Sequence, residues 1–264
     1  MSNHYHLVLH VNAEQAGEWA RDEIIRRLHQ LFSGNLLSQR YERGEILSKV
    51  ELTQLDKDIQ IWRQRLMDIS WFMRVLNESI ARQANTEDNC TGRFWEGRFK
   101  SQALLDDAAI LACMAYVDLN PIRAKLAKTP ERSDYTSIKT RIEKAKQASI
   151  PAHPKQQPAT LFPLVGYPRK EIPEGIPFRL DDYIELVDWT GRVLREDKRG
   201  AIPDTLPPIL ERLHLEGEQW LYLSIHFESP FKGLVGSVYK LKQACQSLGY
   251  IRTPGRRACE QLFT

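Results

Sequence analysis

The sequence predicts an α+β protein, with a sheet in its amino-terminal part followed by an all-helical module. Residues 4–11 alternate like a strand, residues 93–104 do so again, and amphipathic helical patterns fill most of the remainder. No apolar run approaches the ~20 residues that span a bilayer, and no signal-peptide pattern opens the chain. We therefore expect a cytoplasmic protein without a membrane partner.

Composition sets broad limits on function. The 264 residues suffice for one large domain or two modest ones, and the net charge of +3 permits an anionic partner such as nucleic acid without requiring one. The four cysteines are widely spaced and include no Cys-x-x-Cys pair. This spacing argues against both a zinc ribbon and a disulfide framework.

The first hundred residues alternate helix and strand patterns. Apolar spacing predicts a helix over 13–32 that ends at a Ser-Gly-Asn turn. A short helix and a loop are predicted over 40–57, followed by a long helix over 58–85 with a core-facing apolar stripe. Residues 93–104 alternate basic with aromatic side chains, which is typical of an exposed strand or hairpin.

The later elements are predicted to be helical. Asp106 and Asp107 favour a helix start, and this helix runs to the break at Asn120-Pro121. A shorter helix follows over 135–147. Further helices are predicted over 181–196, 207–215, 218–227 and 237–248.

Recurring prolines divide the chain. They run through residues 149–176, which contain few apolar side chains, and this composition indicates an interdomain linker. The predicted domains are therefore 1–148 and 177–264.

His4 and His6 lie one residue apart in the first predicted strand. Because side chains alternate along a strand, both imidazoles face the same side, where they form half of a divalent-metal site. A His-x-His pair is also common in strands as a purely structural feature, which stays the alternative.

Tyr116 and Asn120 lie four residues apart and thus on one face of their predicted helix. His4, His6 and the amide oxygen of Asn120 would make a three-ligand site with open positions, suited to Mg²⁺ or Mn²⁺ bound to a phosphate oxygen. Attack by Tyr116 on a phosphodiester polarised by the metal would leave the cleaved end covalently attached. A helix-anchoring tyrosine and a helix-capping asparagine are the structural alternatives.

Four motifs resemble the HUH single-strand DNA nucleases, and among them the REP-associated tyrosine transposases related to small insertion-sequence transposases. They are MSNHYHLVL at 1–9, GRFWEGRF at 92–99, YVDLNPIRA at 116–124 and DYTS at 134–137, in the expected order. The resemblance implies that His4 and His6 are the metal histidines, Tyr116 the single nucleophile and Asn120 the third ligand.

The resemblance also implies a fold and a partner. The fold is a ferredoxin-like antiparallel sheet with helices, and the partner is single-stranded DNA with a hairpin, like a repetitive extragenic palindrome. Family members carry a strand and one or two helices before the histidine strand, and this sequence starts at that strand. We therefore expect a fold that is incomplete at its amino terminus, from either a truncated gene or a start codon assigned too late.

Further residues are candidates for DNA binding. Cations that contact phosphates and rings that stack on bases are predicted in the segment 93–104, namely Arg93, Trp95, Arg98 and Lys100. Arg123 and Lys125 follow the tyrosine helix, close to the expected scissile phosphate. Solvated charges on a strand and cations beyond a helix C-terminus are the alternatives.

These observations favour a metal-dependent DNA transposase that nicks and rejoins single-stranded DNA through a 5′-phosphotyrosine on Tyr116. A rolling-circle replication initiator or relaxase shares the histidine pair. A non-catalytic DNA-binding relic and a helical interaction protein with structural histidines are alternatives from other classes.

Overall fold

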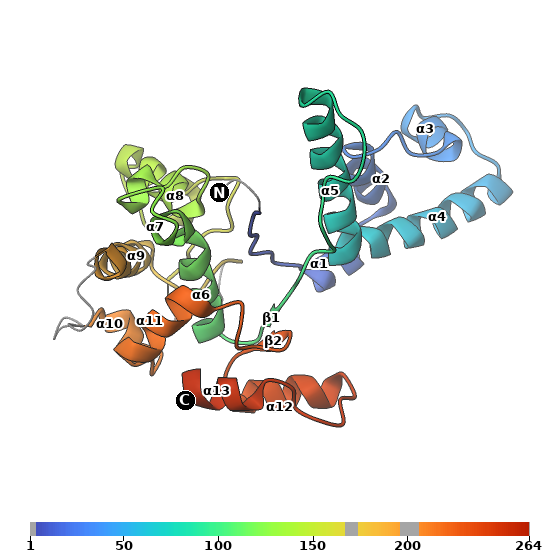
Figure 1. The fold of residues 1–264 in the computed structure, drawn as a ribbon. Coiled ribbons are helices and arrows are strands. Elements are labelled where there is room, and N and C mark those ends of the chain that lie inside the picture. Colours follow the sequence, from blue (N-terminus) through green and yellow to red (C-terminus); the bar gives the residue numbers. More distant parts are fainter. Residues whose placement is uncertain (1–3, 167–173, 196–205, 264) are drawn as a thin grey trace. The chain divides into compact units, whose positions relative to one another are not determined.

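The computed structural model describes residues 4–166, 174–195 and 206–263. These residues are mostly helical and include two short strands (Figure 1). Contacts divide the chain into two compact units. Unit 1 contains Met1–Val8 and Ser101–Thr264, and unit 2 contains Leu9–Lys100. None of the helices in the described ranges combines the length and the apolar character needed to cross a bilayer.

Unit 2 is built from helices around one apolar core. Ser48 is the N-cap of α4 (Lys49–Met67) and forms a capping box with Glu51. The Ser48 hydroxyl accepts a hydrogen bond from the Glu51 backbone N–H, and the Glu51 carboxylate accepts one from the Ser48 backbone N–H. Buried side chains of the second and fourth helices, among them Ile24, Leu55 and Trp62, form the core. The helices are α1 (Ala13–Glu18), α2 (Arg21–His29), α3 (Leu36–Glu42), α4 (Lys49–Met67) and α5 (Ile69–Glu87).

Two helices expected as single elements in this unit are divided. The predicted helix over 13–32 becomes α1 and α2, and the predicted helix over 58–85 is interrupted between α4 and α5. Asp68 causes the second interruption because its backbone is extended and its carboxylate accepts from the backbone N–H of Ser70 at 2.6 Å and of Trp71 at 3.3 Å. A side chain that caps a new helix start can thus end a continuous helical pattern.

Unit 1 contains the remaining helices, packed around a second, larger core. In this unit α6 (Asp107–Asp118) packs against α11 (Gly217–His226), and α7 (Asn120–Arg123) packs against α9 (Leu180–Arg195). The helices are α6 (Asp107–Asp118), α7 (Asn120–Arg123), α8 (Ser137–Gln147), α9 (Leu180–Arg195), α10 (Pro208–Arg212), α11 (Gly217–His226), α12 (Val238–Ser247) and α13 (Arg256–Leu262), with short 3₁₀ turns η1 (Pro130–Arg132) and η2 (Pro154–Gln156).

The predicted ferredoxin-like antiparallel sheet is wrong. The only sheet among the described residues joins β1 (Ala103–Leu104) to β2 (Leu234–Val235), and these two strands are parallel. Each strand is two residues long. The pairing therefore links two segments that are far apart in the sequence, but it does not form a sheet layer that organises the fold. The fold of the described chain is mostly helical.

Both predicted strands fail for a physical reason. Residues 4–11 pair with no strand of the described chain, and Leu7 and Leu9 are 45% and 44% exposed. Alternation supports a strand only where a neighbouring strand satisfies its backbone groups. In the segment 93–104 only the last two residues form a strand, while the Trp95 indole N–H donates to the carbonyl of Asn77 on α5. The aromatic residue therefore anchors a loop to a helix.

The proline-containing segment lies partly within the packed structure. Leu164 and Gln157 are buried, and the Gln157 amide exchanges hydrogen bonds with the backbone N–H and carbonyl of Leu164. Residues 167–173 of the predicted linker, and residue 196 at the end of a predicted helix, lie outside the described residues. The predicted boundaries at 148 and 177 both fall in unit 1.

Asp118 joins three helices in the interior of unit 1. Its buried carboxylate accepts hydrogen bonds from the Tyr183 hydroxyl on α9 at 2.5 Å, from the Ser137 hydroxyl on α8 at 2.9 Å and from the Ile138 backbone N–H at 3.0 Å. Burial raises the pKa of Asp118, and these hydrogen bonds oppose the rise. The network fixes the carboxyl-terminal end of α6, the helix that carries Tyr116.

Candidate active site

Tyr116 lies near the end of α6, which the sequence predicted correctly as a helix. Asp106 caps this helix by accepting from the Ala109 backbone N–H at 3.0 Å, and its second oxygen accepts from the Ser237 N–H at 2.6 Å. Small buried residues on α6, Ala112 and Ala115, allow close packing in the core. The tyrosine ring is half-buried and contacts Phe227, with the ring centroids 6.0 Å apart.

The histidine pair lies beside Tyr116. The His6 ring meets the Tyr116 ring edge-on, with centroids 5.7 Å apart, and the His4 and His6 rings also meet edge-on, at 5.1 Å. All three residues belong to unit 1, although the histidines come from the start of the chain. The structure therefore brings together the predicted nucleophile and both predicted metal histidines.

Glu228, which sequence reasoning missed, links the histidine to the tyrosine. One of its carboxylate oxygens lies 3.2 Å from His6 Nδ1, and the Tyr116 hydroxyl donates a hydrogen bond to the same carboxylate. Glu228 follows α11 in a Phe-Glu-Ser-Pro turn that has no recognisable spacing to the other site residues. Only the packing of α11 on α6 places it here, so no sequence pattern signals it.

Arg123 stacks on the tyrosine rather than projecting freely. Its guanidinium lies 3.9 Å from the Tyr116 ring centroid and donates to the carbonyls of Tyr116 at 2.5 Å and Ser224 at 3.0 Å. Burial lowers the pKa of Arg123. The residue predicted to contact DNA thus fixes the tyrosine helix to α11 and places a positive charge over the phenol.

The surroundings of the site favour the protonated phenol of Tyr116 and the neutral imidazole of His6. Burial raises the pKa of Tyr116, Glu228 adds to the rise and Arg123 opposes it. Burial also lowers the pKa of His6, against the attraction of Glu228. Tyr116 must therefore lose its proton to a neighbour to become a nucleophile, and Glu228 is in hydrogen-bond contact with it.

His6 is oriented as a metal-binding imidazole is. Its Nδ1 faces the Glu228 carboxylate, and its buried Nε2 has no hydrogen-bond partner in the described part of the chain. A carboxylate on one ring nitrogen fixes the tautomer that leaves the other nitrogen free to bind a metal. This unpartnered nitrogen is the observation that fits a metal ligand.

Asn120 lies one turn beyond Tyr116, at the start of α7. It is 8% exposed, and its side-chain nitrogen is buried without a hydrogen-bond partner in the described residues. Within those residues no group of three or more His, Cys, Asp and Glu side chains is arranged to hold a metal. A metal at the histidine pair would therefore need another kind of third ligand, and the Asn120 amide oxygen is the predicted one.

The other predicted DNA-binding residues are divided between the two units. Arg93, Trp95, Arg98 and Lys100 belong to unit 2, where Arg93 donates to the Trp95 carbonyl at 2.8 Å. Arg98 and Lys100 are exposed. Lys125 in unit 1 is also exposed and has a positive φ of 58° just after α7. Of the two predicted DNA-binding residues in unit 1, Arg123 is the one that the described structure places in contact with Tyr116.

Comparison with known proteins gives no match to any family model, curated protein or solved structure.

Proposed function

We propose that this protein is a transposase-type enzyme that cleaves and rejoins single-stranded DNA through a covalent phosphotyrosine on Tyr116. The observation that carries the proposal is the packing of the Tyr116 ring against His6, whose Nδ1 lies 3.2 Å from the Glu228 carboxylate that also acts on the phenol. A phenol paired with a proton acceptor and held next to two imidazoles has the parts of a nucleophilic site that acts on phosphate esters. The resemblance of the YVDLNPIRA segment to tyrosine transposases supports the same interpretation.

The reaction follows from the residues around the phenol. The Tyr116 oxygen attacks the phosphorus, the bond from phosphorus to the 3′ oxygen breaks, and the 5′-phosphate stays on the tyrosine. The phenolic proton passes to the Glu228 carboxylate, and the departing 3′ oxygen takes a proton from water. The Arg123 charge stabilises the developing phenolate. Rejoining reverses these steps, with a 3′-hydroxyl attacking the phosphotyrosine.

A divalent ion is part of the proposal. His4, His6 and Asn120 are the residues that would hold it, and the unpartnered Nε2 of His6 fits this role. Mg²⁺ or Mn²⁺ bound there would supply Lewis-acid polarisation of the phosphodiester. The proposed partner is hairpin-containing single-stranded DNA of the repetitive extragenic palindrome type, in the cytoplasm.

Two observations favour a second function, that of a non-catalytic DNA-binding protein. In the described residues the antiparallel sheet that carries the histidines of the family is missing, and Arg123 donates its hydrogen bonds to two backbone carbonyls. Such a protein would bind the same DNA without forming a covalent bond to it.

Covalent capture tests the proposal. The full chain is incubated with a labelled hairpin oligonucleotide carrying single-stranded flanks, with Mn²⁺ or with a chelator. We expect a denaturation-resistant adduct with Mn²⁺ only, because the neutral phenol needs a polarised phosphate. Peptide mass spectrometry should locate the nucleotide on Tyr116. Binding without an adduct would instead indicate the non-catalytic function.

Glu228→Gln should slow capture by about a hundredfold, since loss of a general base typically costs a factor of about 10²–10⁴. Glutamine keeps a hydrogen bond to the phenol but does not accept its proton. Rates of adduct formation are compared at saturating oligonucleotide, with Glu218→Gln on α11 as the control because Glu218 is exposed. Equal rates in both variants would exclude Glu228 as the proton acceptor.

A further inference from the structure

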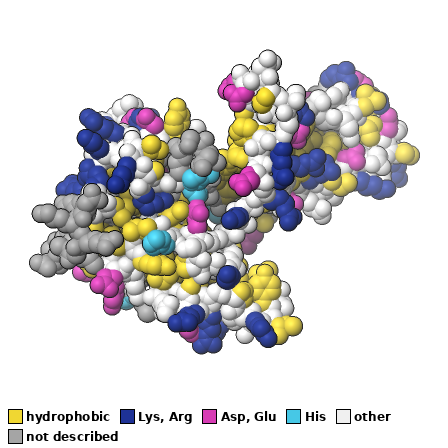
Figure 2. Space-filling model, in the orientation of Figure 1, with side chains coloured by type: hydrophobic (Ala, Val, Ile, Leu, Met, Phe, Trp, Pro, Cys, Tyr) yellow, Lys and Arg dark blue, Asp and Glu magenta, His cyan; other side chains and the backbone are white. Residues whose placement is uncertain are grey.

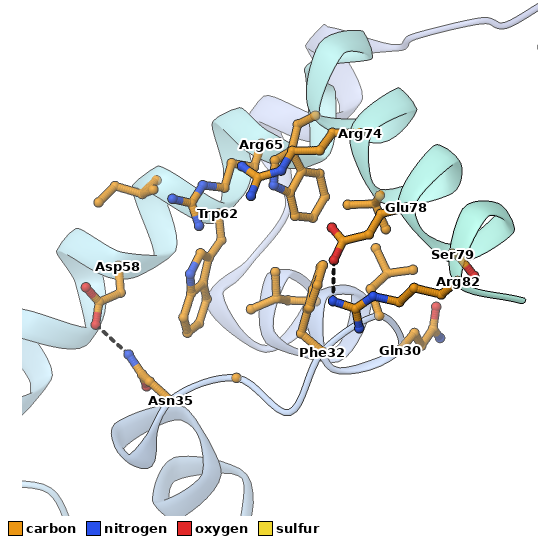
Figure 3. A pocket seen from close by; sticks show the side chains of 16 residues that line it. Gln30, Phe32, Asn35, Asp58, Trp62, Arg65, Arg74, Glu78, Ser79 and Arg82 are labelled. Atoms are coloured by element: carbon orange, nitrogen blue, oxygen red, sulfur yellow. Dashed lines mark hydrogen bonds and ion pairs between the residues drawn. The ribbon is translucent and has the colours of Figure 1, made fainter. Parts of the chain in front are cut away.

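A groove in unit 2 gathers aromatic rings and arginines from α2, α4 and α5 and the turn after α2. It has a volume of about 970 Å³, and its walls include Phe32, Trp62, Trp71, Arg65 and Arg74 (Figure 3). All of its lining residues lie within unit 2. The interruption at Asp68 turns the chain from α4 into α5 and thereby opens this groove between two helices that the sequence predicted as one.

The aromatic side chains are only partly used by the core. Trp62 is 8% exposed and belongs to the core, whereas Phe32 is 43% exposed and Trp71 is half-buried. The Phe32 and Trp71 rings contact each other, with centroids 5.5 Å apart. They offer a partly exposed apolar ring surface on which a planar base can stack.

The charges of the groove leave two cations unneutralised. Asp58 already accepts from Asn35 at 2.8 Å and Gln54 at 3.1 Å, and Glu78 pairs with Arg82 at 2.5 Å. Arg65 and Arg74 are exposed, and neither has an ion-pair partner among the described residues.

Arg65 and Arg74 both line the groove, and in the view of Figure 3 their side chains extend over the same end of it. Basic side chains are also visible over the helices of unit 2 in Figure 2. Two adjacent guanidinium groups repel each other unless an anion lies between them, and a phosphate satisfies both.

We propose that this groove binds a stretch of single-stranded DNA, with bases on the Phe32 and Trp71 rings and a backbone phosphate between Arg65 and Arg74. The inference rests on the proposed function for the choice of DNA as the ligand. It adds a binding site that belongs to unit 2, whereas the residues assigned to cleavage belong to unit 1. Duplex DNA fits poorly because its bases are already stacked on one another.

Binding of a fluorescein-labelled thymidine 12-mer tests this site. The protein is the full chain carrying Tyr116→Phe, so that cleavage does not interfere, and anisotropy is measured over a series of salt concentrations. The double variant with Arg65→Gln and Arg74→Gln should bind the 12-mer at least tenfold more weakly. It should also lower the slope of log affinity against log salt concentration by about 0.7, because the two arginines neutralise one phosphate and each neutralised phosphate of a single strand contributes about 0.7 to that slope.

The matched control is Lys49→Gln with Lys57→Gln. These two lysines are exposed, belong to unit 2 and do not line the groove. Replacing both removes the same total charge as replacing both arginines. The control should change affinity less than about twofold, because long-range attraction is screened by salt. Equal losses of affinity in the two double variants would mean that charge acts without a local site, and would overturn the inference.

A second variant keeps the test independent of charge. Phe32→Leu removes the ring, preserves an apolar side chain at an exposed position, and should weaken binding of the 12-mer severalfold. Unchanged affinity in this variant, or a duplex 12-mer that competes equally well, would overturn the stacking arrangement. A wild-type groove that binds no 12-mer would overturn the inference altogether.

The outcomes separate this inference from the proposed function. Loss of 12-mer binding in the arginine variant, without any covalent adduct from the wild-type chain, would support the groove and reject cleavage. An adduct from the wild-type chain, with 12-mer binding equal in the arginine variant and its control, would support cleavage and reject the groove.

Discussion

Tyr116→Phe is expected to abolish the covalent adduct with a hairpin oligonucleotide and to leave non-covalent binding nearly unchanged. Phenylalanine keeps the ring that packs against His6 and Phe227 and that lies under Arg123. It removes the attacking oxygen and its hydrogen bond to Glu228. Loss of one such hydrogen bond costs only about 1 kcal/mol of stability, so the variant should fold.

A control tyrosine separates chemistry from general effects. Tyr239 on α12 is 67% exposed, and Tyr239→Phe should form the adduct at the wild-type rate. Adduct yield is measured on denaturing gels and binding by anisotropy, at the same protein concentration. An adduct that persists in Tyr116→Phe would assign the covalent bond to another residue and reject the proposed mechanism.

Sequence patterns located the residues of this site better than they located its fold. The helix that carries Tyr116 follows from its cap at Asp106 and its apolar spacing, and the structure confirms it. The two histidines and the tyrosine were grouped by chemistry and by resemblance, and the structure brings them into contact. Their roles as ligands and nucleophile stay predictions.

The sheet could not be predicted correctly from alternation alone. A strand is stable only when a second strand satisfies its N–H and C=O groups, and a single alternating segment does not reveal whether that partner exists. Residues 4–11 alternate but pair with no strand in the described part of the chain. The true strand pair joins Ala103–Leu104 to Leu234–Val235, two short segments far apart in sequence.

Glu228 and the groove were missed for different reasons. Glu228 has no local pattern because its contacts with Tyr116 and His6 arise from long-range packing. The groove was not predicted because the sequence pattern predicts one helix over 58–85 with a core-facing stripe, and a continuous helix leaves no opening between α4 and α5. The N-cap residue Asp68 ends α4 and redirects the chain into α5, which leaves Trp71 half-buried.

Asp118→Ala is expected to lower the free energy of unfolding of unit 1 by about 3–5 kcal/mol. The substitution leaves the hydroxyls of Tyr183 and Ser137 and the N–H of Ile138 without their acceptor. Each buried donor without a partner costs about 1–3 kcal/mol. Because Tyr116 lies on the same helix two residues earlier, the variant should also lose any covalent capture.

The measurement is urea unfolding followed by tryptophan fluorescence, since Trp220 is buried in the same core. Asp118→Asn keeps the shape of the side chain and should cost less than the alanine variant, because the hydroxyl groups can rotate to suit an amide. Asp134→Ala is the control. Its carboxylate is exposed and pairs with Lys139, so its loss should cost less than about 1 kcal/mol.

The pH dependence of the stability difference between wild type and Asp118→Asn distinguishes a buried carboxyl group that titrates from a polar group that only accepts hydrogen bonds. Burial raises the pKa of Asp118, so the native state binds its proton more tightly than the unfolded chain does. Its contribution to stability is complete below the ordinary aspartate value of about 3.9 and falls as the pH rises through the raised pKa. The difference between wild type and Asp118→Asn should therefore be larger in acid than at neutral pH. An equal difference at both would mean that hydrogen bonds to the carboxylate offset its burial completely.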